Sequence, residues 1–189
     1  MQKALPKHAK SKKIELWFQD EARVGQKGTL TYIWARTGSR PRMPHDLRYE
    51  CAYVFGAVCP ARDTGVALIL PDADIPAMNL HLEAISAHVE EDSHAAIIID
   101  GAGWHKEGGK LCVPNNITLI RLPSYSPELN AQENIWEYLR PNYLAGKVFD
   151  TYDDIVDGCC LAWNELIATP GKIKSIASRN WLNLPQVSS

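Results

Sequence analysis

Three acidic residues occupy positions in the sequence at which enzymes often hold metal ions. Asp20 follows the apolar stretch KIELWFQ, Asp100 follows the apolar run AAIII, and Glu133 lies at the start of the helical pattern AQENIWEYLR. Each acid alone is more often a turn-former or a helix cap than a catalyst. Together they form an all-oxygen ligand set that suits Mg²⁺ or Mn²⁺, and a pair of such ions can drive phosphoryl transfer.

The elements that must position these acids begin with an antiparallel meander. Alternating apolar residues predict a strand over residues 14–20, which ends at Asp20, and a second strand over LTYIWAR, residues 30–36. The segments CAYVFGAV and GVALIL predict two further strands, joined by a hairpin turn around Asp63, to which we assign no chemical role.

The second half of the chain alternates helices with strands. The predicted elements are a helix over 79–91, a buried strand over 94–99, a strand over 117–123, a helix from the N-cap Asn130 up to Pro141, and a helix from the N-cap Thr151 that ends before Pro170. This order predicts an α/β fold with a mixed central sheet and flanking helices. Ligands bind such sheets at the carboxyl ends of strands, where we expect Asp20 and Asp100.

Composition excludes several classes of protein. The length of 189 residues indicates one folded domain. The net charge of −2 gives no overall electrostatic argument for binding nucleic acid. No apolar run is long enough for a membrane span, and no secretory signal is visible. Five cysteines without a C-x-x-C pair favour a reduced, cytoplasmic setting and argue against zinc.

Two basic segments are candidates for contacts with a DNA backbone. Residues 1–13 hold five lysines and no acid, and we take them as a basic tail or linker before one domain over 14–189. The second segment is the loop over 34–48. The candidate residues are Lys12, Lys13, Arg36, Arg40 and Arg42. Such residues more often face water, so a DNA-contact role is favoured only if the fold is one that binds a negatively charged substrate.

Three sequence blocks resemble the signature blocks of a known family. WFQDEARVG, IIIDGAGWH and LPSYSPELNAQENIWEYLR are similar to those of the DDE transposases of the mariner superfamily, in particular its bacterial insertion-sequence branch. The resemblance covers about residues 14–165 and is most specific in the third block. It implies a ribonuclease H-like fold in which Asp20, Asp100 and Glu133 are the catalytic, metal-binding acids.

Two positions depart from the family pattern. Ala131-Gln132 precedes the glutamate where relatives usually have proline and then a small or apolar residue, and Gly101 follows Asp100 where many relatives have asparagine. Neither departure removes one of the three acids, so we keep all three as predicted metal ligands. Glu21 and His105 are candidates to orient a metal ligand or to contact phosphate. A capped or buried structural histidine is an equally good interpretation of His105.

The resemblance also implies a reaction. Water activated by two Mg²⁺ or Mn²⁺ ions attacks a phosphodiester at the transposon end, and the freed 3′-hydroxyl then attacks target DNA at a TA site within a homodimeric synaptic complex. Relatives carry N-terminal helix-turn-helix modules that read the terminal repeats, and nothing before Ile14 could fold into one. We therefore expect the catalytic half alone, in a truncated, split-frame or separately expressed form.

Two alternatives to this function remain open. The first is a ribonuclease H-like nuclease that hydrolyses nucleic acid without strand transfer, because the same acids serve both reactions. The second is a non-catalytic transposase remnant that binds DNA or dimerises.

Overall fold

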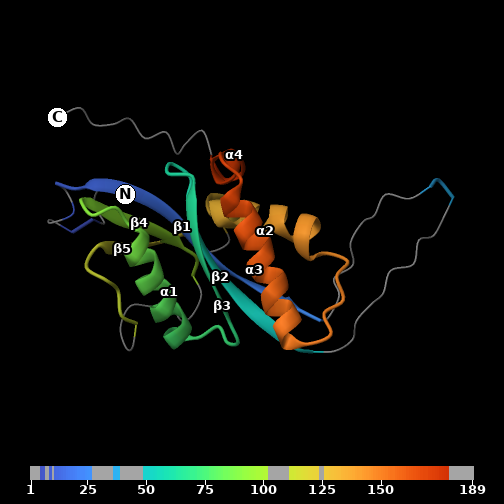
Figure 1. The fold of residues 1–189 in the computed structure, drawn as a ribbon. Coiled ribbons are helices and arrows are strands. Elements are labelled where there is room, and N and C mark those ends of the chain that lie inside the picture. Colours follow the sequence, from blue (N-terminus) through green and yellow to red (C-terminus); the bar gives the residue numbers. More distant parts are fainter. Residues whose placement is uncertain are drawn as a thin grey trace.

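The computed structural model describes most of the chain: residues 5–6, 9, 11–26, 36–38, 49–101, 111–123 and 126–178. Within these residues, a five-stranded sheet has the strand order β3-β2-β1-β4-β5 (Figure 1). The strands are β1 (Lys13–Gly25), β2 (Cys51–Cys59), β3 (Thr64–Leu70), β4 (Ser93–Ile99) and β5 (Ile117–Arg121). The first three strands form the predicted antiparallel meander, and β4 and β5 run parallel to β1.

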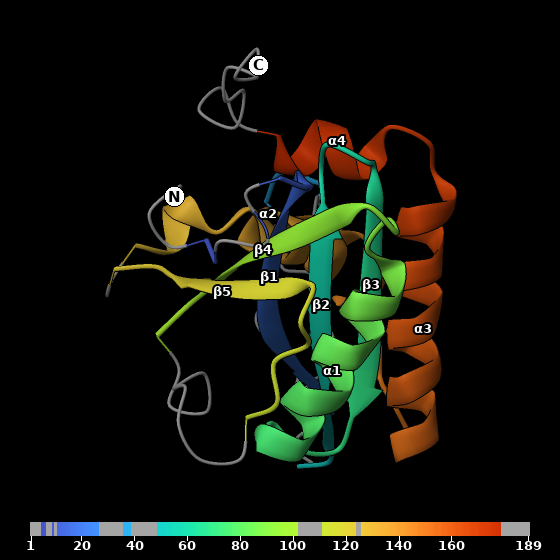
Figure 2. The same cartoon turned by 90° about the vertical axis from the view of Figure 1, so that its left-hand side faces the viewer.

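Helices cover both faces of this sheet. They are α1 (Ile75–His88), α2 (Ala131–Leu139), α3 (Tyr152–Ala168) and α4 (Lys172–Ala177), with the short turns η3 (Pro127–Leu129) and η4 (Arg140–Leu144) on either side of α2. Figure 2 shows α1 in front of the sheet and α2 behind it. Successive strand residues point to opposite faces, so Trp17 joins the core beneath α1 and Phe18 joins the core beneath α2, α3 and α4.

The first strand is longer than its sequence pattern predicts. β1 does not end at Asp20 but continues to Gly25. Its residues 13–18 pair with β4, whereas residues 18–25 pair with β2 in the opposite sense. The prediction of a strand end at Asp20 was wrong, because the backbone bonds to β2 carry the strand through that residue. The strand predicted over 30–36 lies outside the described residues, apart from Arg36.

Helix boundaries agree with the sequence at two N-caps and differ elsewhere. Asn130 and Thr151 are the N-caps of α2 and α3, as predicted. The first helix starts earlier than predicted, because the Asp74 carboxylate accepts a hydrogen bond from the Ala77 amide at 2.9 Å. The chain continues in a π-helical turn through Pro141, where the prediction ended the helix, and α4 was not predicted. No helix of the described residues has the length and apolarity needed to cross a membrane.

Candidate active site

Strand register relates the positions of Asp20 and Asp100. The parallel pairing of β1 with β4 ends where Phe18 lies opposite Ile98. Two residues further along each strand are Asp20, within β1, and Asp100, directly after β4. Both aspartates therefore follow the last paired residues by two positions, at the carboxyl end of β4.

The Asp20 side chain is buried between the sheet and α2. It is 8% exposed, and its Oδ2 accepts a hydrogen bond from Trp136 Nε1 at 2.9 Å. Burial, and then the nearby carboxylates of Glu133 and Glu21, raise the pKa of Asp20 to about 7, against the opposing hydrogen bonds from the Glu21 backbone and from Trp136. Asp20 therefore lies in a site that disfavours its negative charge.

Glu133 comes to this site on the first turn of α2. Asn130 fixes that turn twice, because its Oδ1 accepts a hydrogen bond from the Gln132 amide at 3.1 Å and its Nδ2 donates to the Gln19 carbonyl at 2.9 Å. The second bond ties the start of the helix to β1 one residue before Asp20. A carboxylate in the first helical turn is also favoured by the helix dipole. The same cap that starts the helix thus holds Glu133 close enough to Asp20 to affect its pKa.

The three acids fit a divalent cation in charge and in ligand chemistry. Carboxylate oxygens are the ligands that Mg²⁺ and Mn²⁺ prefer. Burial and neighbouring carboxylates raise the pKa of Asp20, which means that they destabilise its negative charge. A bound cation would offset this destabilisation. The described residues do not form a ready-made group of three or more His, Cys, Asp or Glu side chains around one metal position. Metal binding would therefore have to draw the carboxylates together.

Glu21 points to the opposite face of the sheet from Asp20. Side chains alternate along β1, so Glu21 lies on the α1 side, where Gln19 Nε2 donates a hydrogen bond to its Oε1 at 3.0 Å. His81 of α1 is fully buried on that face against Phe55, with 5.8 Å between the ring centroids. Burial lowers the pKa of His81 to about 4, so this histidine is neutral at physiological pH.

The predicted DNA contacts lie apart from the three acids or outside the described residues. Lys13 begins β1, and its Nζ forms an ion pair with Glu90 Oε2 at 2.7 Å, far along the strand from Asp20. Lys12 and Arg36 are exposed. His105, Arg40 and Arg42 lie outside the described residues.

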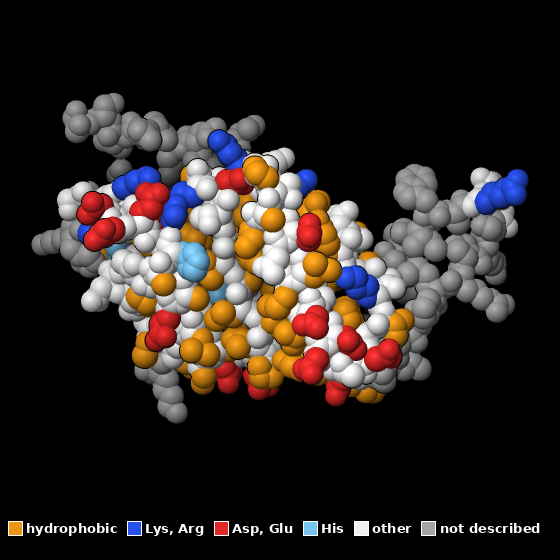
Figure 3. Space-filling model, in the orientation of Figure 1, with side chains coloured by type: hydrophobic (Ala, Val, Ile, Leu, Met, Phe, Trp, Pro, Cys, Tyr) orange, Lys and Arg blue, Asp and Glu red, His pale blue; other side chains and the backbone are white. Residues whose placement is uncertain are grey.

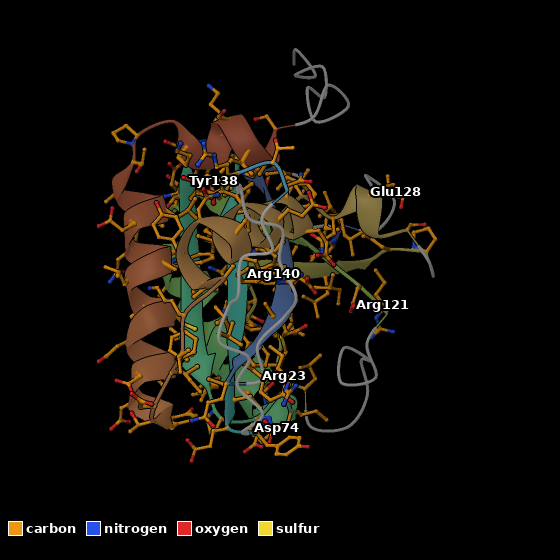
Figure 4. All side chains as sticks on the ribbon, turned by 90° about the vertical axis from the view of Figure 1, so that its right-hand side faces the viewer. Arg23, Asp74, Arg121, Glu128, Tyr138 and Arg140 are labelled. Carbon is orange, nitrogen blue, oxygen red and sulfur yellow. The ribbon has the colours of Figure 1, made fainter. Side chains whose placement is uncertain are left out.

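One residue that contacts the acids was not recognised from the sequence. Trp136 was interpreted as a core residue; it is buried at 2% exposure, but its indole N–H also binds Asp20. Arg121 ends β5 opposite Ile99 (Figure 4). Paired residues share a face of the sheet and Ile99 lies in the core beneath α1, so Arg121 lies on the α1 side, the face opposite to Asp20. The Trp136 contact joins residues 116 positions apart, so local spacing gives no sign of it.

Comparison with known proteins identifies the family. Residues 15–156 match the family model of the DDE superfamily endonucleases. The chain is 52% identical over 130 residues to the uncharacterized protein y4pE/y4sA of Sinorhizobium fredii (strain NBRC 101917 / NGR234), a match covering 69% of this chain and 96% of that protein.

Solved structures of the Mos1 transposase share the fold. A pre-cleavage Mos1 transpososome matches with a TM-score of 0.62 and 13% identity over 85% of this chain and 50% of that chain. A Mos1 mariner paired-end complex with Mn matches with a TM-score of 0.56 and 11% identity over 87% and 56%, respectively. The chain thus spans about half the length of these Mos1 chains. The predicted ribonuclease H-like fold is confirmed: this chain belongs to the DDE superfamily endonucleases and has the catalytic fold of the mariner-type DDE transposases.

Proposed function

We propose that this chain is the catalytic domain of a transposase that cleaves DNA at transposon ends and joins the freed strand to target DNA, with divalent metal ions as cofactor. The observation that supports this proposal is the buried Asp20 carboxylate beside a second acid. Burial and the nearby carboxylates, Glu133 first, raise the pKa of Asp20 to about 7, and Asp100 follows the strand that pairs with β1. Membership of the DDE endonucleases supports the same conclusion.

In the proposed reaction, Asp20, Asp100 and Glu133 hold Mg²⁺ or Mn²⁺, most readily as a pair of ions. When bound, such ions lower the pKa of an attacking oxygen and stabilise the charge on a leaving oxygen. The protein contributes the placement of its ligands. The sheet sets the spacing of the two aspartates, and Asn130 locks the glutamate-bearing turn of α2 to β1. Burial of Asp20 keeps bulk water from competing for that carboxylate.

The same three acids would serve cleavage and strand transfer in turn. In cleavage, the attacking oxygen comes from water and the transposon 3′-hydroxyl leaves. In strand transfer, that 3′-hydroxyl attacks a target phosphodiester, and a target 3′-hydroxyl leaves. Each step exchanges one phosphodiester bond for another P–O bond, so no external energy source is required.

DNA is the proposed substrate, and the charges of the molecule favour one side for its approach. Exposed acids gather at the start of α3 (Figure 3), namely Asp153, Asp154 and Asp157. This end of the molecule would repel a phosphate backbone. The candidate phosphate contacts are Lys12, Lys13, Arg36, Arg40 and Arg42, and the exposed Arg121 at the end of β5 is a further candidate.

Recognition of specific transposon ends and assembly of a synaptic complex are further parts of the proposal. One of the matched structures is a pre-cleavage Mos1 transpososome, and its Mos1 chain is about twice as long as the aligned region. We therefore propose that a DNA-reading module and a second catalytic copy complete the active assembly. The isolated chain would supply the phosphoryl-transfer site.

The experiment that tests this function is product analysis on labelled duplex DNA with Mg²⁺ or Mn²⁺. Wild-type protein is compared with Asp100→Asn, Glu133→Gln and the matched control Glu128→Gln, which removes an exposed acid just before α2. We expect metal-dependent nicks and joined strands from wild type and the control, and neither product from the two site variants. Nicks without joining would favour a nuclease. Equal products from Glu133→Gln and wild type would refute the proposed site.

A further inference from the structure

Trp136 contacts the proposed active site through its only polar atom. Its Nε1 donates to Asp20 Oδ2 at 2.9 Å, and both side chains are buried, at 2% and 8% exposure. A hydrogen bond to a charged carboxylate in such a dry place is worth more than one at the surface. Of the two Asp20 carboxylate oxygens, Trp136 bonds Oδ2.

A glycine makes this placement of the indole possible. Gly56 lies opposite Asp20 in the pairing of β1 with β2. A Cβ atom at Gly56 would lie 2.6 Å from Trp136 Cη2, 2.9 Å from Trp136 Cζ2 and 2.7 Å from Gln132 Nε2. These distances are too short for a Cβ atom, so glycine at this position lets the rigid ring lie against β2 while its N–H bonds Asp20.

The same helix carries the indole and the third acid. Trp136 follows Glu133 by three residues on α2, so the two side chains project from neighbouring positions of one helical surface. Asn130 anchors the start of this helix to the Gln19 carbonyl of β1 at 2.9 Å. Two hydrogen bonds, one from Asn130 and one from Trp136, therefore connect α2 to adjacent residues of β1.

We propose that Trp136 is a positioning residue that orients the Asp20 carboxylate for metal binding, with Gly56 providing the space for its ring. This inference rests on the proposed function, because it assumes that Asp20 binds a metal. Trp136 fixes the orientation of the carboxylate through its bond to Oδ2. The single rigid helix α2 thereby fixes Glu133 and the direction of Asp20 together.

A neighbouring tryptophan provides an internal control for simple core packing. Trp163 of α3 belongs to the same hydrophobic core, is 5% exposed, and lies 6.1 Å from Trp136 between ring centroids. It also packs over a glycine, because a Cβ at Gly65 would lie 3.1 Å from Trp163 Cζ2. Its ring packs in the same core, whereas the indole N–H that bonds Asp20 belongs to Trp136. The pairs Trp136 with Gly56 and Trp163 with Gly65 are therefore matched.

The test measures Mn²⁺ affinity of the full chain, without DNA, by titration calorimetry at pH 8. Trp136→Phe removes the N–H and keeps a ring, and Gly56→Ala displaces the ring and keeps the N–H. Each should weaken Mn²⁺ binding by about 10-fold or more, as loss of a bond that orients a metal ligand does. Trp163→Phe and Gly65→Ala should bind Mn²⁺ as wild type does. Thermal unfolding of all four variants selects those that remain folded, and either member of the Trp136 pair suffices for the test.

A spectroscopic measurement on metal-free protein tests the contact itself. The indole Nε1–H resonance of Trp136 should be shifted downfield and protected from solvent exchange, and Asp20→Ala should remove both properties. Trp163 should be unaffected by that substitution. An unchanged Trp136 resonance in Asp20→Ala would overturn the proposal.

The outcomes separate the positioning role from the proposed function. Unchanged Mn²⁺ affinity in Trp136→Phe and Gly56→Ala would overturn the positioning role and leave the metal site standing. Equal losses in the Trp163 pair would also overturn it, since packing alone would then explain the effect. Wild-type protein that binds no Mn²⁺ would overturn both the metal-dependent function and this inference.

Discussion

The charge on Asp20 should make the metal-free protein less stable at high pH, and Asp20→Asn should remove this penalty. The pKa of Asp20 rises from its ordinary 3.8 to about 7 in the fold, mainly through burial. At 1.36 kcal/mol for each pH unit of pKa change, ionised Asp20 costs the folded state about 4 kcal/mol above pH 7. Asparagine keeps an oxygen acceptor for Trp136 and carries no charge. The variant should therefore be more stable than wild type at pH 8, by about 4 kcal/mol.

The sign of the pH dependence follows from the raised pKa. The folded state holds the Asp20 proton more tightly than the unfolded state, so this contribution to stability is fully present below pH 3.8 and lost as the pH rises to about 7. Between these limits, wild type should lose up to about 1.4 kcal/mol per pH unit relative to Asp20→Asn.

Denaturant unfolding in the presence of a metal chelator, at pH 5, 6, 7 and 8, measures this difference. The control is Asp157→Asn, which removes an exposed acid from α3 and should leave the pH dependence as in wild type. The same series in excess Mg²⁺ should stabilise wild type at pH 8 and leave Asp20→Asn unchanged, because the cation replaces the proton on the carboxylate. An Asn variant that is no more stable than wild type at pH 8 would refute the electrostatic reasoning.

Three further substitutions test other contacts. Asp63→Ala should destabilise the fold by about 1–2 kcal/mol in denaturant unfolding, because the Asp63 carboxylate accepts hydrogen bonds from the Gly171 and Lys174 amides at the start of α4; an unchanged midpoint would contradict this cap. Arg62→Met should cost about 3–5 kcal/mol by the same assay, because it leaves the buried Glu15 carboxylate without the guanidinium at 2.9 Å; a loss below 1 kcal/mol would contradict it. Arg121→Gln should weaken binding of duplex DNA and reduce the slope of log affinity against log salt by about 1, whereas an unchanged slope would exclude a phosphate contact.

The sequence predicts the class of fold because its local patterns are strong. The meander of β1, β2 and β3, the buried strand before Asp100, and the N-caps Asn130 and Thr151 all follow from short-range periodicity and capping chemistry. The end of β1 was mispredicted because pairing with a distant strand, β2, decides it. Likewise, α4 is capped by Asp63 from 111 residues away in the bond to Lys174, which no local pattern reveals.

The candidate site shows the same division. The three acids can be selected from the sequence, since each follows a recognisable strand or begins a recognisable helix. Their assignment as metal ligands stays a prediction, supported by the register of β1 with β4 and by the raised pKa of Asp20. The residues around them, Trp136 and Gly56, could not be selected. Their roles depend on a helix lying across two strands, which is a property of the tertiary structure.

Asp100 offers the most direct test of the central claim, that acids from three elements form one metal-dependent phosphoryl-transfer site. It is assigned to the site by strand register, so its loss tests the assembly as well as the chemistry. The measurement is Mn²⁺-dependent nicking of labelled duplex DNA by wild type and Asp100→Asn, with Mn²⁺ affinity determined on the same samples. We expect the variant to lose nicking and to bind Mn²⁺ at least 10-fold more weakly, as when a ligand is removed. Wild-type nicking by folded Asp100→Asn would contradict it.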